Sequence, residues 1–321
     1  MPQSFIPNGE IMKKLNFLLS VFACTVVVFM ALSVNPAPVD AAGISKDSVF
    51  VIGRITENPK KHHAALEEMG AYIMSHLKDL GYTSMEVVMV KSIDEMIRLM
   101  HEGKVDAISE TAFSTVRLID EAGAQALLRE WKKGVASYKT VFFAAKDGDV
   151  ETLADLKDKR VAFEDPGSTS AFLVPFATLR QAGLVPVELT AIDRKPPADK
   201  VGYAFTSDEM TQLMWVARGI ADAGAFSDLN WQDYQDNRMV TDNLKIIHEG
   251  VPILRSVFSV RGDLPEAVKA RIAATLMAMA DDDVGRKILD VYNKVKQYDR
   301  LEGDEMAKSL TNIRQLSEML K

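Results

Sequence analysis

The residues best suited to bind a ligand lie in residues 161–171, which read Val-Ala-Phe-Glu-Asp-Pro-Gly-Ser-Thr-Ser-Ala. This pattern predicts a strand that ends at Phe163, a Pro-Gly turn and a helix that begins near Thr169. The first backbone N–H groups of a helix have no partner within it and carry the positive end of its dipole. Together with the hydroxyls of Ser168, Thr169 and Ser170, they would form an anion site without any charged side chain.

Two familiar motifs are absent from this segment. No Gly-Lys-Ser/Thr follows the turn, so it is not a P-loop. The Gly-x-Ser-x-Gly pattern of a nucleophile elbow is also missing. A simpler alternative remains, in which Ser168 only caps the following helix. Pro175 falls inside that helix, expected over residues 169–181, and should kink it.

The elements around this segment alternate between strand-like and helix-like patterns. The first half is predicted to run strand, helix, strand, helix, strand, over residues 48–53, 62–80, 85–90, 92–101 and 103–109. Further strands are expected at 138–145, 158–163, 189–192, 220–225, 244–248 and 253–260, with a helix at 210–219 and a helical tail over 265–321. This order favours two parallel α/β units, with the chain returning to the first unit near residues 252–259.

Composition narrows the class of protein. The chain has 321 residues, 38 Lys and Arg, 45 Asp and Glu, a net charge of −7 and 47% hydrophobic residues. That length suggests about two domains of roughly 150 residues each. Ordinary hydrophobic and charged fractions exclude a disordered chain, a coiled coil and a multi-span membrane protein. The acidic balance argues against nucleic acid as a partner, because phosphate backbones are held mainly by Lys and Arg.

The N-terminus carries a targeting pattern. Lys13 and Lys14 precede an apolar run over residues 15–34, and small residues follow up to Ala42. This predicts a signal peptide, residues 1–41, cleaved after Ala41. A retained membrane anchor and a lipoprotein modified at Cys24 are alternatives, and all three place the remainder outside the cytoplasmic membrane. Cys24 is the only cysteine, so the mature chain would have no disulfide and no thiolate nucleophile.

A family resemblance begins at the same serine-rich segment. Phe163-x-Asp-Pro-x-Ser-Thr-Ser-x-x-x-x-Pro175 resembles the signature of phosphate/phosphite/phosphonate-binding proteins (PhnD-like), the extracytoplasmic solute-binding components of ABC importers. Matching stretches follow the family's order: Gly103-Lys-Val-Asp-Ala107, Tyr138-Lys-Thr140, residues 153–163, Gly219-Ile-Ala-Asp-Ala-Gly224 and Arg261-Gly-Asp-Leu-Pro265. The resemblance covers about residues 48–304.

The resemblance implies an α/β, type II periplasmic-binding fold with two lobes, a two-strand hinge and a ligand cleft between the lobes. Residues 42–142 and 255–321 would form lobe 1, and residues 143–254 would form lobe 2. A small phosphorus oxyanion (phosphonate, phosphite or phosphate) would be captured by lobe closure and delivered to an ABC permease. The protein would be monomeric, would need no cofactor or metal and would not be an enzyme. Signalling to a membrane sensor protein is the alternative output.

The resemblance also assigns residues to the site. Ser168, Thr169 and Ser170 would hold the oxyanion, and Tyr138 would donate a hydroxyl from the first lobe. Asp222 would face the cleft from the second lobe, although a structural role at a strand end is the simpler alternative.

Departures from the family pattern concern the charge of the cleft. Glu110 and Thr111 stand where the family usually has an uncharged pair. A carboxylate that points inward there would repel a dianion and favour a ligand with an amine; the alternative is that Glu110 points into solvent. Arg54 follows a predicted strand near the cleft and could balance Glu110 or the ligand, or lie on the surface.

Overall fold

The computed structural model describes residues 48–237 and 240–321, which belong to one unit, Pro38–Lys321. The predicted signal peptide over residues 1–41, with its anchor and lipoprotein alternatives, lies outside the described residues. Within residues 48–237 and 240–321, no helix is both long and apolar enough to span a bilayer.

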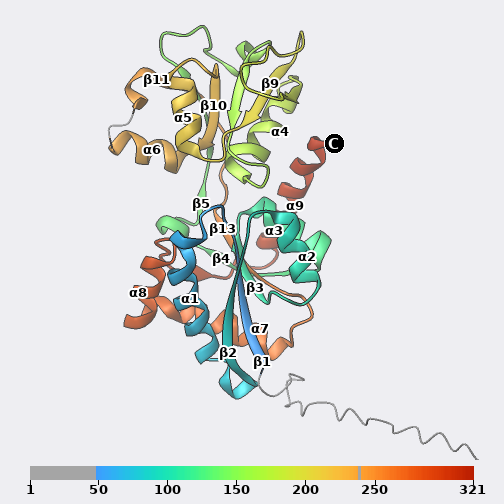
Figure 1. Cartoon of the computed structure of the whole chain (residues 1–321), viewed down its shortest axis with the longest axis vertical. Helices are drawn as coiled ribbons and strands as arrows, with labels where there is room; N and C mark the ends of the chain where they lie inside the picture. The colour runs from blue at the N-terminus through green and yellow to red at the C-terminus, as the bar shows by residue number, and fades with distance from the viewer. Residues whose placement is uncertain (1–47, 238–239) are drawn as a thin grey trace, which may run out of the picture. The chain divides into compact units, whose positions relative to one another are not determined.

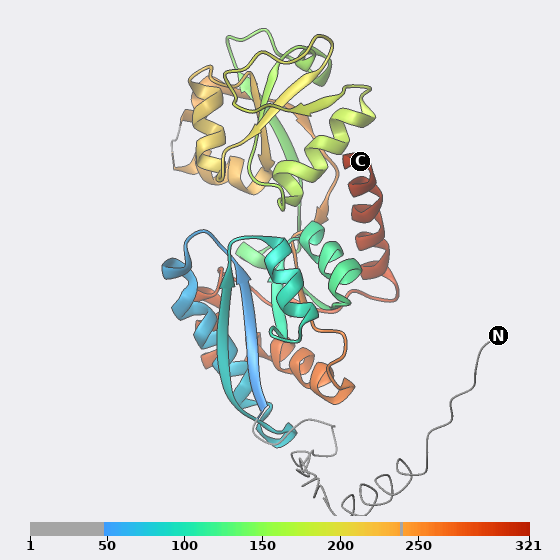
Figure 2. The same ribbon diagram turned by 45° about the vertical axis from the view of Figure 1, so that its right-hand side comes forward.

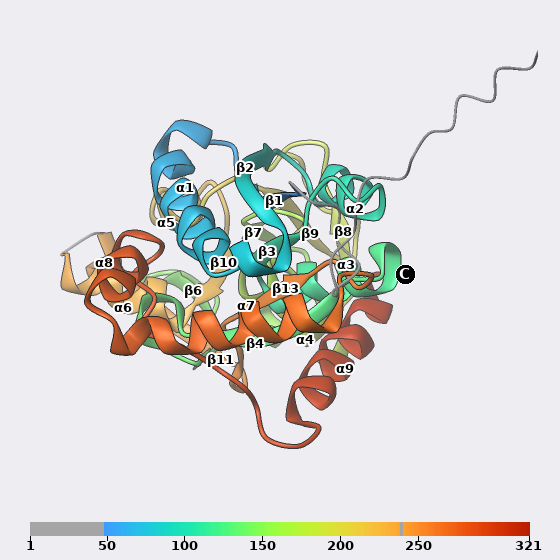
Figure 3. The same ribbon diagram turned by 90° about the horizontal axis from the view of Figure 1, so that it is seen from below.

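One six-stranded sheet, with its helices, forms what we call the first lobe; its strand order is β14-β4-β13-β3-β1-β2 (Figure 1). Its strands are β1 (Ser48–Ile55), β2 (Tyr82–Val90), β3 (Ala107–Glu110), β4 (Gln125–Glu130), β13 (Ser256–Val260) and β14 (Tyr298–Asp299). Its helices are α1 (Pro59–Ser75), α2 (Ile93–His101), α3 (Ala112–Ala122), α7 (Glu266–Ala278) and α8 (Asp283–Val291), with short 3-10 turns at Lys78–Leu80, Lys132–Gly134 and Met279–Asp281. β1, β2 and β3 run parallel, while β13 is antiparallel to β3 and β4. Figure 3 shows α7 lying along this sheet.

A second six-stranded sheet, the second lobe, has the order β11-β6-β10-β7-β9-β8. Its strands are β6 (Thr140–Ala145), β7 (Arg160–Phe163), β8 (Pro186–Glu188), β9 (Val201–Phe205), β10 (Ala223–Ser227) and β11 (Leu244–Glu249). Its helical segments are a 3-10 turn at Leu153–Leu156, a π-turn at Thr169–Leu173, α4 (Val174–Gln181), α5 (Glu209–Ala217), α6 (Asp228–Asp236) and a 3-10 turn at Val240–Asn243. β7, β8, β9 and β10 are parallel, while β6 runs antiparallel to both of its neighbours, β10 and β11.

A short antiparallel ribbon of β5 (Ser137–Tyr138) and β12 (Ile253–Leu254) carries the chain between the two sheets. This matches the two-lobed α/β architecture and two-strand hinge expected from the sequence. The expected lobe boundary after residue 142 falls inside β6, all of which pairs within the second sheet. The last helix, α9 (Glu305–Ser317), and the 3-10 turn Glu318–Leu320 lie against α3 of the first lobe and α4 of the second (Figure 2).

Apolar residues at helical spacing build the core of the first lobe. Leu66, Met69 and Ile73, one face of α1, are fully buried against Phe50 and Ile52 of β1. Each such side chain contributes about 1.5–3 kcal/mol of hydrophobic stabilisation. α1 begins at Pro59 and ends at Ser75, earlier than the predicted 62–80, because Asn58 caps it and a separate 3-10 turn follows.

Several predicted elements are wrong in detail. The single strand expected at 138–145 is two strands, because β5 pairs in the hinge and β6 in the second sheet. The strand expected at 189–192 lies at Pro186–Glu188 instead. The tail is not helical throughout, since β14 interrupts it to pair with β4. Strand β9 was not predicted from the sequence; its apolar residues follow a Pro-rich loop.

Gly224 in β10 permits close aromatic packing in the second lobe. A Cβ at Gly224 would lie 2.5 Å from the ring of Phe143, whose centroid is 4.3 Å from that of Phe226. Gly224→Ala is therefore expected to destabilise the fold by about 1–3 kcal/mol in denaturant unfolding, because the packed ring cannot withdraw freely. Gly250→Ala is the matched control, with its nearest neighbour atom at 3.5 Å. Equal midpoints for the two variants would contradict this packing argument.

Candidate functional site

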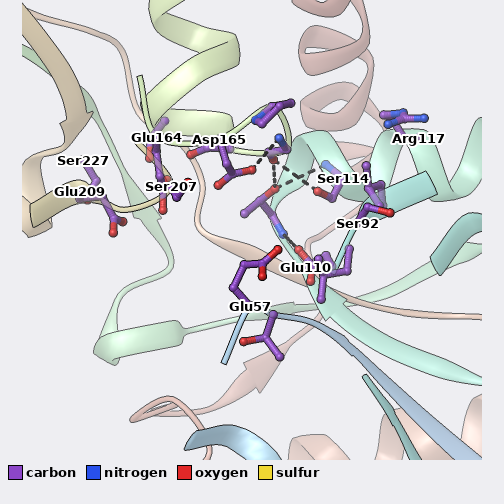
Figure 4. A pocket seen from close by; sticks show the side chains of 18 of the residues that line it. Glu57, Ser92, Glu110, Ser114, Arg117, Glu164, Asp165, Ser207, Glu209 and Ser227 are labelled. Carbon is purple, nitrogen blue, oxygen red and sulfur yellow. Dashed lines mark hydrogen bonds between the residues drawn. The ribbon is translucent and has the colours of Figure 1, made fainter. Parts of the chain in front are cut away.

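A cavity of about 580 Å³ lies where loops from both lobes meet (Figure 4). Its lining includes residues from the loops that follow the carboxyl ends of β1, β2, β3, β7, β9 and β10. In the first sheet β1, β2 and β3 are parallel, and in the second sheet β7, β9 and β10 are parallel. The carboxyl ends of each set of strands therefore lie at one edge of its sheet. Crevices at such edges are the usual ligand sites of open α/β sheets.

Helix N-termini surround this cavity. Each of the six loops leads into a helical segment whose first turn has a side-chain cap, at Asn58, Ser92, Thr111, Ser168, Asp208 and Ser227. The positive ends of these helix dipoles therefore converge on the cavity. This arrangement favours an anion even though the lining contains more carboxylates than basic side chains.

The serine-rich turn has the local structure expected of it. Ser168 and Ser170 line the cavity, and both are buried. The Ser168 hydroxyl accepts a hydrogen bond from the Ala171 amide at 3.2 Å, so the capping role is real and coexists with its place in the cavity. The helical run continues from the π-turn at Thr169 directly into α4, since Leu173 and Val174 both have right-handed helical dihedrals. Its hydrogen bonding changes from π to α next to Pro175, which has no N–H to donate.

Thr169 has a different role from its two neighbours. Its hydroxyl accepts a hydrogen bond from the Phe113 amide at 2.9 Å, and its side chain is fully buried outside the cavity lining. Across the same contact, the hydroxyls of Thr111 and Ser114 donate to the carbonyl of Gly167 at 3.2 and 3.3 Å. Thr169 and Thr111 thus join the serine-rich turn to the N-terminus of α3, and Thr111 also lines the cavity.

Glu110 lies at the cavity and does not point into open solvent. It lines the cavity at the end of β3, and the Thr111 amide donates a hydrogen bond to its carboxylate at 3.3 Å. Burial raises the pKa of Glu110 to about 7, against the opposing effects of Lys132 and Arg54. Near neutral pH this carboxyl group is therefore a mixture of its charged and neutral forms.

Tyr138 lies beside two polar partners at the hinge. Its ring is buried, and the guanidinium of Arg255 lies over it at 4.6 Å from the centroid. The Tyr138 hydroxyl interacts with the Ser170 side chain. Arg255 and Lys132, which also line the cavity, were not predicted from the sequence. Lys132 lies in a short 3-10 turn and Arg255 between two short strands, and neither stands in a recognisable motif.

Three carboxyl groups gather on the second-lobe wall of the cavity: Glu164 and Asp165 before the serine-rich turn, and Glu209 at the start of α5 (Figure 4). Burial raises the pKa of Glu164 well above its usual value, and repulsion from Glu209 and Asp165 adds to this. Burial also raises the pKa of Asp165. The Ser168 hydroxyl interacts with Glu164, so this carboxyl cluster adjoins the serine-rich turn. Desolvated carboxyl groups held this close favour a cationic partner.

Asp222 requires a correction. Its carboxylate accepts hydrogen bonds from the Arg160 amide at 2.8 Å and from the Arg160 Nε at 3.1 Å, and it is not among the cavity residues. The reason is strand direction: Asp222 precedes β10, at the amino end of the parallel strands, while the cavity lies at the carboxyl end. Ser227, the last residue of β10, and Asn230, in the first turn of α6, line the cavity at the carboxyl end of this strand instead.

Arg54 lies behind the cavity rather than in its lining. Its guanidinium donates to the Asn293 side chain at 3.2 Å, while its Nε is buried without a hydrogen-bond partner. Its charge lowers the pKa of Glu110, which is the balancing role considered for it. Among the described residues, no group of His, Cys, Asp and Glu side chains is arranged to hold a metal ion.

Solved structures share this architecture. XAC2383 from Xanthomonas citri bound to ATP is 24% identical, with a TM-score of 0.80 over 86% of this chain and 100% of that chain. Its chloride-bound form is also 24% identical, with a TM-score of 0.79 over 84% and 99%. PhnD1 from Prochlorococcus marinus in complex with methylphosphonate is 21% identical, with a TM-score of 0.62 over 85% and 98%. At these identities the likeness is one of fold.

The family itself is shown by the sequence. The family described as "ABC transporter, phosphonate, periplasmic substrate-binding protein" matches residues 55–306. This range includes the serine-rich turn, the hinge strands and the described residues of all six cavity loops. The chain therefore belongs to the family of periplasmic substrate-binding proteins of phosphonate ABC transporters.

Proposed function

We propose that this protein captures a small zwitterionic phosphonate, with its oxyanion at the serine-rich turn and its amine at the carboxyl cluster, and delivers it to a membrane permease. One observation carries this proposal: a single cavity combines converging helix N-termini with the desolvated cluster of Glu164, Asp165 and Glu209. A phosphonate dianion without an amine would be repelled by the carboxyl cluster. An amine without a phosphonate would leave the helix N-termini without an anion to bind.

The oxyanion end has donors of the right kind. Ser168, Ser170 and Tyr138 line the cavity with hydroxyl groups, and free N–H groups of the first helical turns lie beside them. Hydrogen bonds to a charged acceptor are stronger than neutral ones and fix its orientation. A phosphonate, with three oxygens on one phosphorus, can accept several of these donors at once.

Lobe closure is the proposed mechanism of capture. The two lobes are connected by the β5–β12 ribbon, and both contribute to the cavity lining. A ligand that contacts both lobes binds the closed form more tightly than the open form and so shifts the population toward it. No bond is made or broken in this mechanism. Secretion through residues 1–41 and a monomeric state belong to the same proposal.

A thermal-shift panel on the purified protein tests this function. The panel contains methylphosphonate, 2-aminoethylphosphonate, phosphite, phosphate, sulfate and ethanolamine. The largest rise in melting temperature is expected with 2-aminoethylphosphonate, because a ligand that binds only the folded state stabilises it by about 2.7 kcal/mol at 100 times its dissociation constant. Ethanolamine, which has the amine without the phosphonate, is the matched control. Failure of every phosphonate to shift the melting temperature would refute the proposal.

A further inference from the structure

The cavity wall on the first-lobe and hinge side holds two cations that the oxyanion site does not need. Lys132 and Arg255 both line the cavity, and Arg255 exposes only 9% of its surface. Within the described part of the chain, neither has a carboxylate within ion-pair distance. The Nε of Arg255 is also buried without a hydrogen-bond partner. A desolvated cation without a counter-ion is costly, which indicates that a ligand group completes this wall.

Neighbouring carboxylates neutralise these cations only in part. Glu130 is fully buried, and its carboxylate accepts hydrogen bonds from Ser109 at 2.5 Å and Tyr298 at 2.9 Å. The pKa of Glu110 is raised to about 7 by burial, so this group is partly neutral. Burial and the charges of Arg255 and Arg54 lower the pKa of Lys132 to about 8, although Glu130 and Glu110 act the other way. Positive charge is thus in excess here.

This pair is separate from the donors of the serine-rich turn. Ser168 and Ser170 belong to the second lobe, whereas Lys132 follows β4 of the first. The buried ring of Tyr138 connects the two regions, with Ser170 at its hydroxyl and Arg255 over its face. A cavity of about 580 Å³ is also within the size range of sites for ligands larger than methylphosphonate.

We propose that Lys132 and Arg255 form a second anion subsite that binds a carboxylate of the same ligand, so that the preferred ligands are phosphonates carrying both an amine and a carboxylate. The planar guanidinium of Arg255 would present its two terminal nitrogens to the two carboxylate oxygens. Lys132 would contribute a point charge beside them. This inference rests on the proposed function, because it adds a third contact to a ligand already held at two.

Two ligands that differ by one carboxylate test this subsite. Calorimetric titration of the purified full chain compares 2-amino-3-phosphonopropionate with 2-aminoethylphosphonate. Wild-type protein is expected to bind the carboxylated ligand about 10-fold to 100-fold more tightly, the range of one charged hydrogen-bonded contact. Lys132→Gln and Arg255→Gln are each expected to weaken binding of the carboxylated ligand more than binding of 2-aminoethylphosphonate, so that most of this preference is lost. Lys133→Gln, the exposed neighbour with the same charge change, should keep the preference.

The outcomes separate this subsite from the proposed function. Equal affinity of wild-type protein for the two ligands would overturn the subsite and leave phosphonate binding intact. Retention of the preference in both Lys132→Gln and Arg255→Gln would also overturn it, provided that their unfolding transitions stay cooperative. Absence of binding by both ligands, and by methylphosphonate, would overturn the function and the subsite together. The comparison of the two ligands on wild-type protein tests the subsite even if a variant misfolds.

Discussion

Simultaneous replacement of Ser168 and Ser170 by alanine is expected to weaken phosphonate binding by about 100-fold or more. Each hydroxyl that donates to a charged oxygen contributes about 1.5–3 kcal/mol, and tenfold in affinity corresponds to about 1.4 kcal/mol. Both side chains line the cavity, and no other hydroxyl lies on the same helical turn within its lining. The affinity of the double variant for 2-aminoethylphosphonate, measured by calorimetric titration, checks this value.

A stability effect must be separated from this binding effect. Ser168 caps the π-turn through the Ala171 amide, so the double variant should also lose about 1 kcal/mol of folding stability. Asp282→Ala is the control, because Asp282 caps α8 through the Gly285 amide at 2.8 Å, also accepts a hydrogen bond from the Tyr72 hydroxyl at 3.1 Å and does not line the cavity. It should lose similar stability and keep wild-type affinity. Affinity within threefold of wild type in the double variant would rule out the serine-rich turn as the oxyanion site.

Binding of the amine is expected to strengthen as pH rises through the raised pKa values of the carboxyl cluster. Burial raises the pKa values of Glu164 and Asp165, so both groups shift toward their neutral forms as pH falls. An ammonium group binds the ionised carboxyl forms, so protons must leave before or during binding. Affinity is therefore lost as pH falls through these raised values, and is fully present above them.

The comparison that isolates this effect uses two ligands and two variants. 2-Aminoethylphosphonate should gain more affinity between pH 6 and pH 8 than methylphosphonate, which has no amine and shares only the ionisation of the phosphonate. Glu164→Gln and Glu209→Gln should each reduce the pH dependence for the amine-bearing ligand, since each removes a carboxylate of the cluster. Glu302→Gln, an exposed position, is the control. Identical pH profiles for the two ligands would show that the carboxyl cluster does not bind the amine.

The local part of the site was predictable from the sequence. Ser168 and Ser170 follow a strand and a Pro-Gly turn within ten residues, so their place at a helix N-terminus depends on neighbours in the chain alone. The same holds for α2, predicted over residues 92–101 and found at Ile93–His101 with Ser92 as its cap. The burial of residues such as Leu66 and Met69 can likewise be predicted from the sequence, because apolar residues with a 3.6-residue period lie on one face of a helix.

The remainder depends on contacts between distant segments. Thr169 was predicted to bind the ligand, but its hydroxyl meets the Phe113 amide, 56 residues away in the chain. Asp222 was wrongly placed in the cavity because the sequence does not show which end of β10 faces the cavity. Glu209 joins Glu164 only through the pairing of β9 with β7, and β9 itself was not predicted. No local pattern specifies these encounters.

Calorimetric titration of the wild-type protein with 2-aminoethylphosphonate tests the central claim most directly. The account predicts saturable binding of one ligand per chain, with no chemical change in the recovered ligand and weaker binding of both methylphosphonate and ethanolamine. Binding of ethanolamine equal to that of 2-aminoethylphosphonate, or no heat with any phosphonate, would contradict it.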